Sequence, residues 1–250
     1  MNNKERLSHH YKNIAGEYND ALFFAHGYRK WLVELIIKEL EIRKKDFVVD
    51  LGGGTGIVSK MICDKVCLEK DVLCVDPSKE MLNCAAKLSG VSTLCSTALA
   101  FVQKEHLRYN KILIKEAVHH FENRMNKWNG IYRQLYAKGR LLIITRPIFP
   151  DFPFFKAALN SFKQCQPDYH IILKELEDAK FSLKLEIKDY FLKINKTRWF
   201  ELIRQRFMSN LIPFTDEQLN SGIKELEQKY REKEILEFVD RLIFIGGTKR

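Results

Sequence analysis

Four glycines fall within five positions in the stretch DFVVDLGGGTGIVSKMI, residues 46–62. Glycine costs backbone entropy inside a helix or a strand, so a cluster of this density indicates a backbone path that other residues do not follow easily. The apolar run 48–51 before the cluster has the pattern of a buried strand. Residues 57–66 have a helical pattern, and the apolar residues of 57–62 begin one face of this helix. The glycines are therefore predicted to form a strand-to-helix turn at the carboxyl edge of a sheet, where open α/β folds bind ligands.

The same alternation of strand and helix continues along the chain. Short apolar runs, with stretches of helical pattern between most of them, occur at 47–51, 72–76, 91–95, 111–115, 140–145, 186–194 and 240–247. Strands that alternate with helices predict a parallel sheet with helices on both faces. Residues 4–40 are also helical in pattern, and about 45 residues between the last two strands form further helices. The predicted fold class is α/β, a Rossmann-like seven-stranded, mostly parallel sheet with an added helical cap.

The spacing of the glycines narrows the kind of ligand. Gly52, Gly54 and Gly56 form the pattern G-x-G-x-G. The dinucleotide fingerprint G-x-G-x-x-G places its last glycine where Ile57 stands, and no Gly-Lys pair follows to complete a P-loop. The pattern favours a backbone brought close to a ligand that carries no pyrophosphate, and a tight turn without a ligand is the alternative.

Composition limits the class of protein. Lys and Arg number 42 against 32 Asp and Glu, a net charge of +10 that could attract an anionic partner, including nucleic acid. Acidic residues lie between the basic ones and no basic arm is visible, which favours a solvated basic surface over nucleic-acid binding. No membrane span is expected, because the chain has no apolar run of about 18 residues. Its first residues, MNNKERLSHHYKN, lack the apolar core of a secretory signal.

Six cysteines in 250 residues do not resemble a disulfide scaffold. Cys63 and Cys67 lie four apart on one predicted helix face, but no neighbouring His or Cys pair completes a set of metal ligands. The cysteines are predicted to be reduced thiols and mostly packed, in a cytoplasmic protein without a bound metal.

The stretch VVDLGGGTG resembles motif I of the class I S-adenosylmethionine-dependent methyltransferases, and further matches extend from about residue 11 to 145. In VLCVDPSKEML, Asp76 matches the family's acid that binds both ribose hydroxyls, and Met81 its apolar contact to the adenine. In STALAF, Ala98 fits the third motif, but Thr97 replaces the usual acid. KILIKEAVHHF resembles the family's fourth strand, and YKNIAGEYND its opening helix, whose tyrosines close over the cofactor.

The resemblance implies S-adenosyl-L-methionine as the cofactor. It implies cofactor-binding roles for Tyr11, Tyr18, Asp50, Gly52, Gly53, Gly54, Asp76, Pro77, Met81, Thr97, Ala98, Lys115 and Glu116. Asp50 would either orient the turn or face the methionine amino group. The chain is divided accordingly within a single methyltransferase domain, residues 1–250: an N-terminal helical lid (1–40), a cofactor-binding core (41–147) and the remaining strands (148–250) with a substrate cap at about 195–238.

Two histidines are the candidates for a catalytic base, if the acceptor must lose a proton. His119 and His120 follow the fourth strand, near the expected position of the methyl group, and histidine has an ordinary pKa suited to proton transfer near neutral pH. The alternative is that one of them packs and the other is solvated. Lys115 and Glu116 lie beside them, and a local ion pair between these two is one interpretation of the pair.

The acceptor is expected under the cap, where TRWFELIRQRFMSNLIPF combines aromatic residues with arginines. Candidate substrate contacts are Tyr18, His119, Trp199 and Arg206, although the helical spacing of the aromatic residues favours a place in the core. The predicted enzyme methylates a small-molecule acceptor, with an anionic group as one option. The alternatives are an RNA (tRNA) methyltransferase, a non-catalytic binding or regulatory subunit of the same fold, and, disfavoured by Ile57, a dehydrogenase. The sequence predicts no oligomeric state.

Overall fold

The computed structural model describes residues 26–250. The helices are α3 (His26–Leu40), α4 (Ile57–Val66), α5 (Lys79–Ala85), α6 (Ala98–Val102), α7 (Arg124–Gln134), α8 (Lys156–Cys165), α9 (Tyr169–Asp178), α10 (Lys196–Arg204) and α11 (Asp216–Lys229), with short 3-10 turns η1 (Val118–His120) and η2 (Ser209–Leu211). The strands are β1 (Val48–Leu51), β2 (Val72–Asp76), β3 (Val91–Cys95), β4 (Tyr109–Lys115), β5 (Leu135–Thr145), β6 (Phe181–Asn195) and β7 (Ile235–Lys249).

The strands form one seven-stranded sheet in the order β3-β2-β1-β4-β5-β7-β6. β3, β2, β1, β4 and β5 pair in parallel, whereas β7 is antiparallel to both of its neighbours, β5 and β6. The chain order reverses between β1 and β4, which places the carboxyl ends of these two strands on either side of a topological switch point. The predicted fold class, a mostly parallel seven-stranded sheet, is confirmed.

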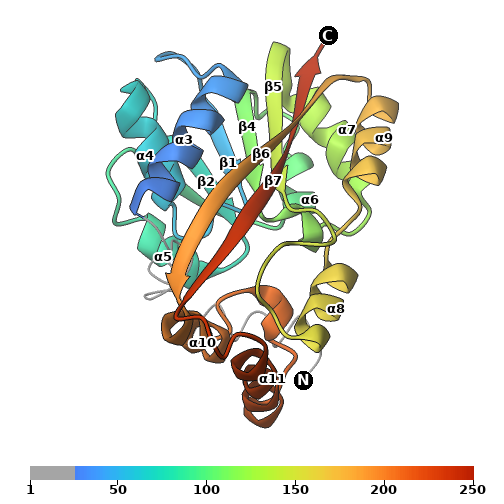
Figure 1. Ribbon diagram of the computed structural model, residues 1–250. Helices are drawn as coiled ribbons and strands as arrows, with labels where there is room; N and C mark the ends of the chain where they lie inside the picture. The colour runs from blue at the N-terminus through green and yellow to red at the C-terminus, as the bar shows by residue number, and fades with distance from the viewer. Residues whose placement is uncertain (1–25) are drawn as a thin grey trace.

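Helices cover both faces of the sheet, α3, α4 and α5 on one and α6, α7 and α9 on the other (Figure 1). Successive residues of a strand point to opposite faces. Ile112 and Ile114 of β4 accordingly belong to the core beneath α6, α7 and α9, and Leu113 to the core beneath α3 and α4. All three are fully buried. Burial on both faces explains the continuous apolar runs from which the strands were predicted.

The cap lies beyond the carboxyl edge of the parallel strands (Figure 1). β6 and β7 are 15 residues long, and β5 pairs with only Ile243–Thr248 of β7, so the other ends of β6 and β7 continue as a two-stranded ribbon. Helices α10 and α11 connect the ribbon, and α8 packs with them around a second apolar core that contains Trp199, Phe154 and Phe162. The cap thus includes residues 152–162 as well as the predicted segment 195–238.

Most predicted elements are found, and the differences concern their ends and the region 148–180. Strands 72–76 and 91–95 and helix 57–66 have the predicted bounds, and α3 confirms the second half of the helical pattern over 4–40; residues 4–25 lie outside the described residues. β4, β5, β6 and β7 all begin earlier than predicted. Helices α8 and α9 were not predicted, because neither belongs to the strand-helix alternation from which the core was recognised.

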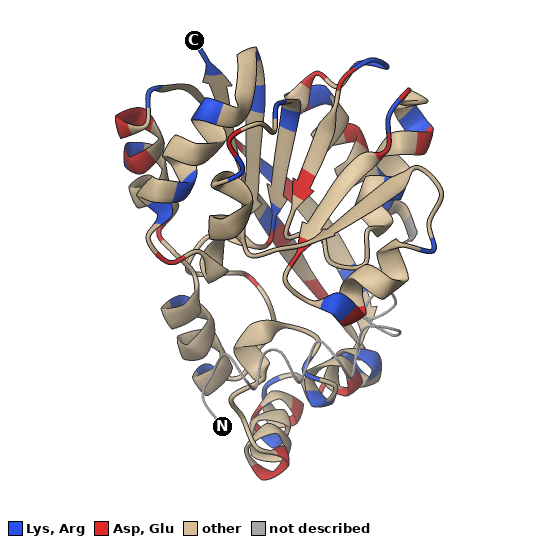
Figure 2. Ribbon diagram, turned by 180° about the vertical axis from the view of Figure 1, so that it is seen from behind, with Lys and Arg blue, Asp and Glu red and all other residues tan. Residues whose placement is uncertain are grey.

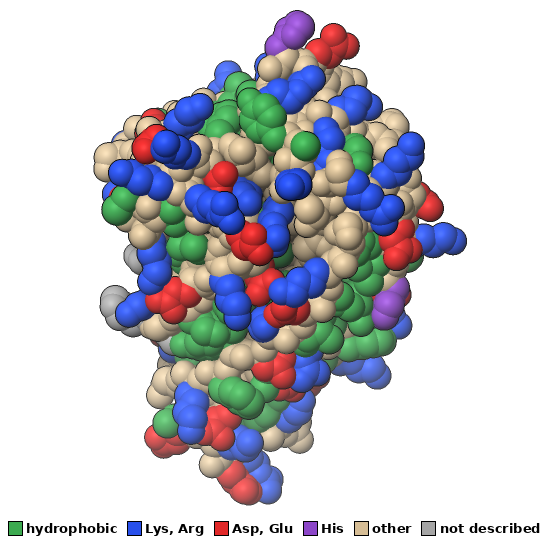
Figure 3. Space-filling view, turned by 90° about the horizontal axis from the view of Figure 1, so that it is seen from above, with side chains coloured by type: hydrophobic (Ala, Val, Ile, Leu, Met, Phe, Trp, Pro, Cys, Tyr) green, Lys and Arg blue, Asp and Glu red, His purple; other side chains and the backbone are tan. Residues whose placement is uncertain are grey.

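Charged residues of both signs are distributed over the molecule. Figure 2 shows acidic and basic positions next to one another along the helices, and Figure 3 shows Lys and Arg spread over one face with Asp and Glu between them. This distribution agrees with the interpretation of the +10 net charge as a solvated basic surface. Among the described residues, no helix is both long and apolar enough to cross a membrane.

Candidate active site

The glycine turn joins β1 to α4, and three of its glycines have positive φ: Gly52 at 81°, Gly54 at 57° and Gly56 at 72°. A Cβ atom on Gly52 would lie 2.5 Å from the Cβ of Ala117, and one on Gly56 would lie 2.8 Å from the Cβ of Ala85. At Gly54 an added Cβ would meet no atom of residues 26–250 within 4 Å. Two of the glycines therefore permit close packing inside the protein. Gly54 instead borders open space, where the bare backbone can approach a ligand.

Asp50 holds the turn in place from below. It is 2% exposed, and the Ser59 hydroxyl on α4 donates a 2.7 Å hydrogen bond to its Oδ2. A Cβ on Gly53 would lie 2.9 Å from this carboxylate and 2.7 Å from the Cys74 thiol. Burial raises the pKa of Asp50 to about 6, against the lowering effect of the Ser59 hydrogen bond. Of the two roles predicted for Asp50, these contacts support the orientation of the turn.

Asp76 at the end of β2 is fixed against the turn by backbone groups. The N–H of Gly54 donates to Asp76 Oδ2 at 3.0 Å, and the N–H of Ser78 donates to Oδ1 at 2.9 Å. Burial raises the pKa of this carboxyl, whereas the two backbone hydrogen bonds lower it. Each oxygen keeps acceptor capacity after these bonds. A rigid carboxylate with two free acceptor positions beside Gly54 fits the two hydroxyls of a ribose.

The residues predicted to surround the adenine lie at the starts of α5 and α6. Ser78 caps α5, Met81 in its first turn is buried, and Pro77 is exposed. Thr97 caps α6 by accepting a 3.2 Å hydrogen bond from the N–H of Ala100, and Ala98 begins the helix. Threonine is a preferred residue at this position, which gives Thr97 a structural reason to be present where the family usually has an acid.

We expect substitutions at two glycines of the turn to differ in their effects, one chiefly on stability and the other chiefly on ligand binding. Both Gly52→Ala and Gly54→Ala place a side chain at positive φ, which costs about 1 kcal/mol or more. Gly52→Ala also clashes with Ala117 and should lower the melting temperature further, whereas Gly54→Ala should chiefly weaken S-adenosylmethionine binding, by at least roughly tenfold. Thermal melting and calorimetric titration of both variants check this. Equal loss of stability with unchanged binding in both would contradict it.

At the carboxyl end of β4, the predicted ion pair between Lys115 and Glu116 is wrong. Glu116 adopts a positive φ of 56°, and its carboxylate pairs with Arg146, the residue after β5. Burial, together with the neighbouring positive charge of Arg146, lowers the pKa of Lys115 to about 8, against the opposing effects of Asp50 and Asp240. A strained non-glycine backbone of this kind is concentrated at functional sites in proteins.

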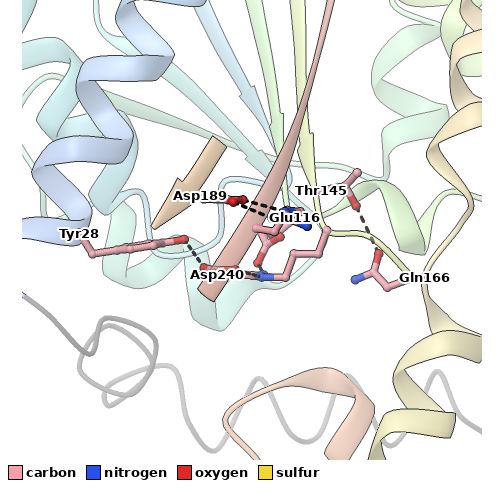
Figure 4. A network of polar contacts seen from close by, with 8 residues as sticks. Tyr28, Glu116, Thr145, Gln166, Asp189 and Asp240 are labelled. Carbon is pink, nitrogen blue, oxygen red and sulfur yellow. Dashed lines mark hydrogen bonds and ion pairs between the residues drawn. The ribbon is translucent and has the colours of Figure 1, made fainter. Parts of the chain in front are cut away.

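A buried polar network connects the sheet to α3 through Asp240 and Tyr28 (Figure 4), and Arg146 belongs to it. Its guanidinium donates to both carboxylate oxygens of Asp240 on β7, at 2.7 and 2.9 Å, and the hydroxyl of Tyr28 on α3 donates to Asp240 at 2.7 Å. Arg146 and Asp240 are 8% and 1% exposed. Sequence reasoning missed all three residues. The sequence did contain a signal for two of them: Arg146 directly follows the apolar run of β5, and Asp240 stands just before the apolar run of β7.

His119 and His120 form the 3-10 turn that follows β4, with ring centroids 4.0 Å apart. Burial lowers the pKa of both imidazoles. The pKa of His119 falls to about 3, and the charge of the nearby His120 adds to the effect of burial there. The Nδ1 atom of His119 is buried and has no hydrogen-bond partner among the described residues. A histidine with this pKa is neutral at pH 7 and is a weak base. His119 therefore fits a hydrogen bond to a ligand better than the predicted removal of a proton.

The two cap residues predicted to contact the acceptor have structural partners. Trp199 is fully buried in the cap core, and its indole N–H donates to the carbonyl of Pro153 at 2.8 Å. Arg206 donates to the carbonyl of Phe214 at 2.9 and 3.2 Å and to the Asp216 carboxylate at 2.6 Å. The structure thus places neither side chain as a free anchor for a substrate. Tyr11 and Tyr18, the remaining predicted contacts, lie outside the described residues.

Comparison with known proteins gives matches to methyltransferases. Residues 49–143 match the family model described as "Methyltransferase domain". The solved structure of the YcgJ protein from Bacillus subtilis superposes with a TM-score of 0.62 and 18% identity, over 87% of this chain and 97% of that chain. A protein of Anabaena variabilis assigned as a methyltransferase of an antibiotic biosynthesis pathway gives a TM-score of 0.65 and 18% identity, over 85% and 95% of the two chains.

Phosphoethanolamine N-methyltransferase 2 of Haemonchus contortus, in complex with S-adenosyl-L-methionine, gives a TM-score of 0.62 and 16% identity. The superposition covers 96% of this chain and 57% of that chain. A sequence search found no match among curated proteins. Residues 49–143 thus resemble a methyltransferase domain, on a fold that this chain shares with solved methyltransferase structures.

Proposed function

We propose that this protein transfers the methyl group of S-adenosylmethionine to a small-molecule acceptor that carries an anionic group. The observation that carries the proposal is the space beside Gly54, bordered by a fixed Asp76 carboxylate at the carboxyl edge of the sheet. The donor, when bound, supplies an electrophilic methyl group on a sulfonium. The protein then has to position the reactants and exclude water, tasks for which this edge and the cap above it are suited.

Different residues contact different parts of the donor and the acceptor. Gly54 allows the backbone to approach the donor, Asp76 accepts hydrogen bonds from the ribose, and Asp50 keeps the turn in place. The remaining predicted cofactor contacts, from Pro77 and Met81 to Thr97 and Ala98, border the adenine at the starts of the two helices. We infer that His119 contacts the acceptor: its buried Nδ1 has no hydrogen-bond partner among the described residues, and a neutral imidazole nitrogen can accept or donate one hydrogen bond.

Several observations support a small anionic acceptor over RNA. The net charge of +10 attracts anions, but Lys and Arg are interleaved with acidic residues, and the face in Figure 3 has no continuous basic patch. The similar Haemonchus contortus enzyme is named for phosphoethanolamine, a small molecule with a phosphate group. All six cysteines are free thiols, which supports a cytoplasmic location.

The test begins with calorimetric titration of the purified chain with S-adenosylmethionine. We expect saturable one-site binding. Metabolite extract, separated by anion exchange, is then incubated with the protein and a methyl-labelled donor, and label should enter compounds of the retained, small-molecule fraction. Label found exclusively in a tRNA fraction would replace the small acceptor by RNA. No binding of the donor would overturn the proposed function as a whole.

A further inference from the structure

A row of charged side chains crosses the carboxyl edge of the sheet on the face covered by α3. Lys115 lies on β4, two residues after Leu113, whose side chain packs in the core beneath α3 and α4. Residues two apart in a strand point to the same face, so Lys115 points to this side of the sheet. Asp50 on β1, Arg146 after β5 and Asp240 on β7 are its charged neighbours.

Every acid in this row already has a partner. Asp50 accepts from Ser59, and both Asp240 and Glu116 pair with Arg146. Lys115, by contrast, forms no hydrogen bond or ion pair with any residue in the described part of the chain. Among the described residues, the ammonium of Lys115 thus contacts no counter-ion, whereas the guanidinium of Arg146 contacts two.

Another lysine of β4, Lys111, has the kind of acidic partner that Lys115 lacks among the described residues. Lys111 is four residues before Lys115, on the same face but at the amino end of β4, and its ammonium lies 3.9 Å from the carboxylate of Asp46. Burial lowers the pKa of both lysines, that of Lys115 to about 8. At pH 7 about 90% of Lys115 is therefore still charged. A buried charge without a partner is unfavourable, so this position costs stability in the unliganded protein.

We propose that the Lys115 ammonium is the counter-ion of an anionic group on a bound ligand. The inference rests on the proposed function, because it places that ligand at the carboxyl end of β4, near the glycine turn. Two sources share the required chemistry: the carboxylate of the donor's methionine and the anionic group of the acceptor. Either one would pair with a lysine that residues 26–250 leave without a contacting counter-ion.

Three variants separate this role from a structural one: Lys115→Met, which removes the charge, Lys115→Arg, which keeps it, and Lys111→Met, the matched control on the same strand. In the donor arm, Lys115→Met should bind S-adenosylmethionine roughly 10- to 100-fold more weakly than the parent, as expected for a lost charge-assisted hydrogen bond. Lys115→Arg should recover most of the affinity, and Lys111→Met should leave it unchanged. Decarboxylated S-adenosylmethionine should then bind equally to the parent and to Lys115→Met.

In the acceptor arm, the parent and Lys115→Met are saturated with S-adenosylhomocysteine and titrated with inorganic phosphate. If the acceptor supplies the anion, donor binding stays unchanged and phosphate binding is lost in Lys115→Met. If neither donor nor phosphate binding depends on Lys115, the inference is wrong even though the parent binds the donor. A parent that binds no donor would instead overturn the proposed function.

The pH dependence gives a second readout. A bound anion favours charged Lys115, so affinity should be constant below pH 8 and fall above it, by up to tenfold per pH unit, and Lys115→Arg should not show this fall. The other groups that face Lys115 are Asp50, Asp240, Arg146 and Arg29. Asp50, with a pKa of about 6, titrates below this range, and arginine stays charged.

Lys115→Met should melt at the same temperature as the parent or higher, and a marked decrease would show a structural partner and overturn the inference.

Discussion

Replacing Asp240 by alanine is expected to lower the free energy of unfolding by about 3 kcal/mol, the largest change in stability that the charged residues of this protein predict. The substitution removes the acceptor of two Arg146 hydrogen bonds and of the Tyr28 hydroxyl in a place where water does not replace it. Burial and the Asp240 charge raise the pKa of Tyr28, so this phenol is a neutral donor that loses its hydrogen bond to Asp240 in the variant. Thermal unfolding should show a decrease of roughly 6 to 12 °C for a chain of this length.

The neighbouring strand supplies a matched control. Arg241 donates to both oxygens of Asp189 at 2.8 and 2.7 Å, the same two-bond geometry as in the buried pair, but both of these side chains are largely solvent-exposed. An exposed ion pair contributes little because water and salt screen it, so Asp189→Ala should leave the unfolding transition almost unchanged. Similar losses in Asp189→Ala and Asp240→Ala would show that burial is not the source of the effect.

Local patterns were sufficient to predict the central part of the sheet. Residues 72–76 and 91–95 and the helix 57–66 were placed correctly because each is short, apolar on at least one face and bordered by turn residues. β6 was underestimated at its beginning, where Ser182, Lys184 and Leu185 are exposed at the edge of the sheet. An exposed edge strand does not show the continuous apolar run of a strand buried on both faces.

The cap depends on contacts that sequence patterns do not reveal. Its core brings Phe154 together with Trp199 and Phe207, rings that stand about 45 to 53 residues apart in the chain but have centroids 5.6 and 6.1 Å from that of Phe154. The helical spacing of the aromatic residues in α10 correctly favoured a core position for Trp199. The segment 152–155, which belongs to neither a helix nor a strand, gave no such signal.

The site was predictable to the extent that its residues are close in sequence. The glycine turn and Asp76 were recognised from two short stretches, and their hydrogen bond confirms that these lie together. The network of Tyr28, Arg146 and Asp240 joins residues that are 94 and 212 positions apart, so no local pattern connects them. The same reason explains the wrong partner for Glu116: sequence reasoning paired it with its neighbour, whereas the sheet brings Arg146 to it from the next strand.

Asp76→Ala is expected to cause the largest loss of function, a decrease in S-adenosylmethionine affinity of roughly 100-fold or more. Hydrogen bonds to a charged group contribute about 1.5–3 kcal/mol each, and the proposed ribose contact comprises two of them. The substitution also releases the N–H of Gly54, which Asp76 now holds beside the open space of the turn. Calorimetric titration of the parent and the variant with S-adenosylmethionine measures the combined effect.

Two further measurements assign that loss to the ribose. Asp71→Ala removes an exposed acid just before the opposite end of β2 and should leave binding unchanged, which controls for the change in net charge. S-adenosylhomocysteine and its 2′-deoxy analogue should differ in affinity for the parent but hardly for Asp76→Ala, because the variant no longer distinguishes the hydroxyl. An equal difference in both proteins would mean that Asp76 acts through the shape of the turn alone. Unchanged binding in Asp76→Ala would remove this carboxylate from the site, and with it the main support for a nucleoside donor at the glycine turn.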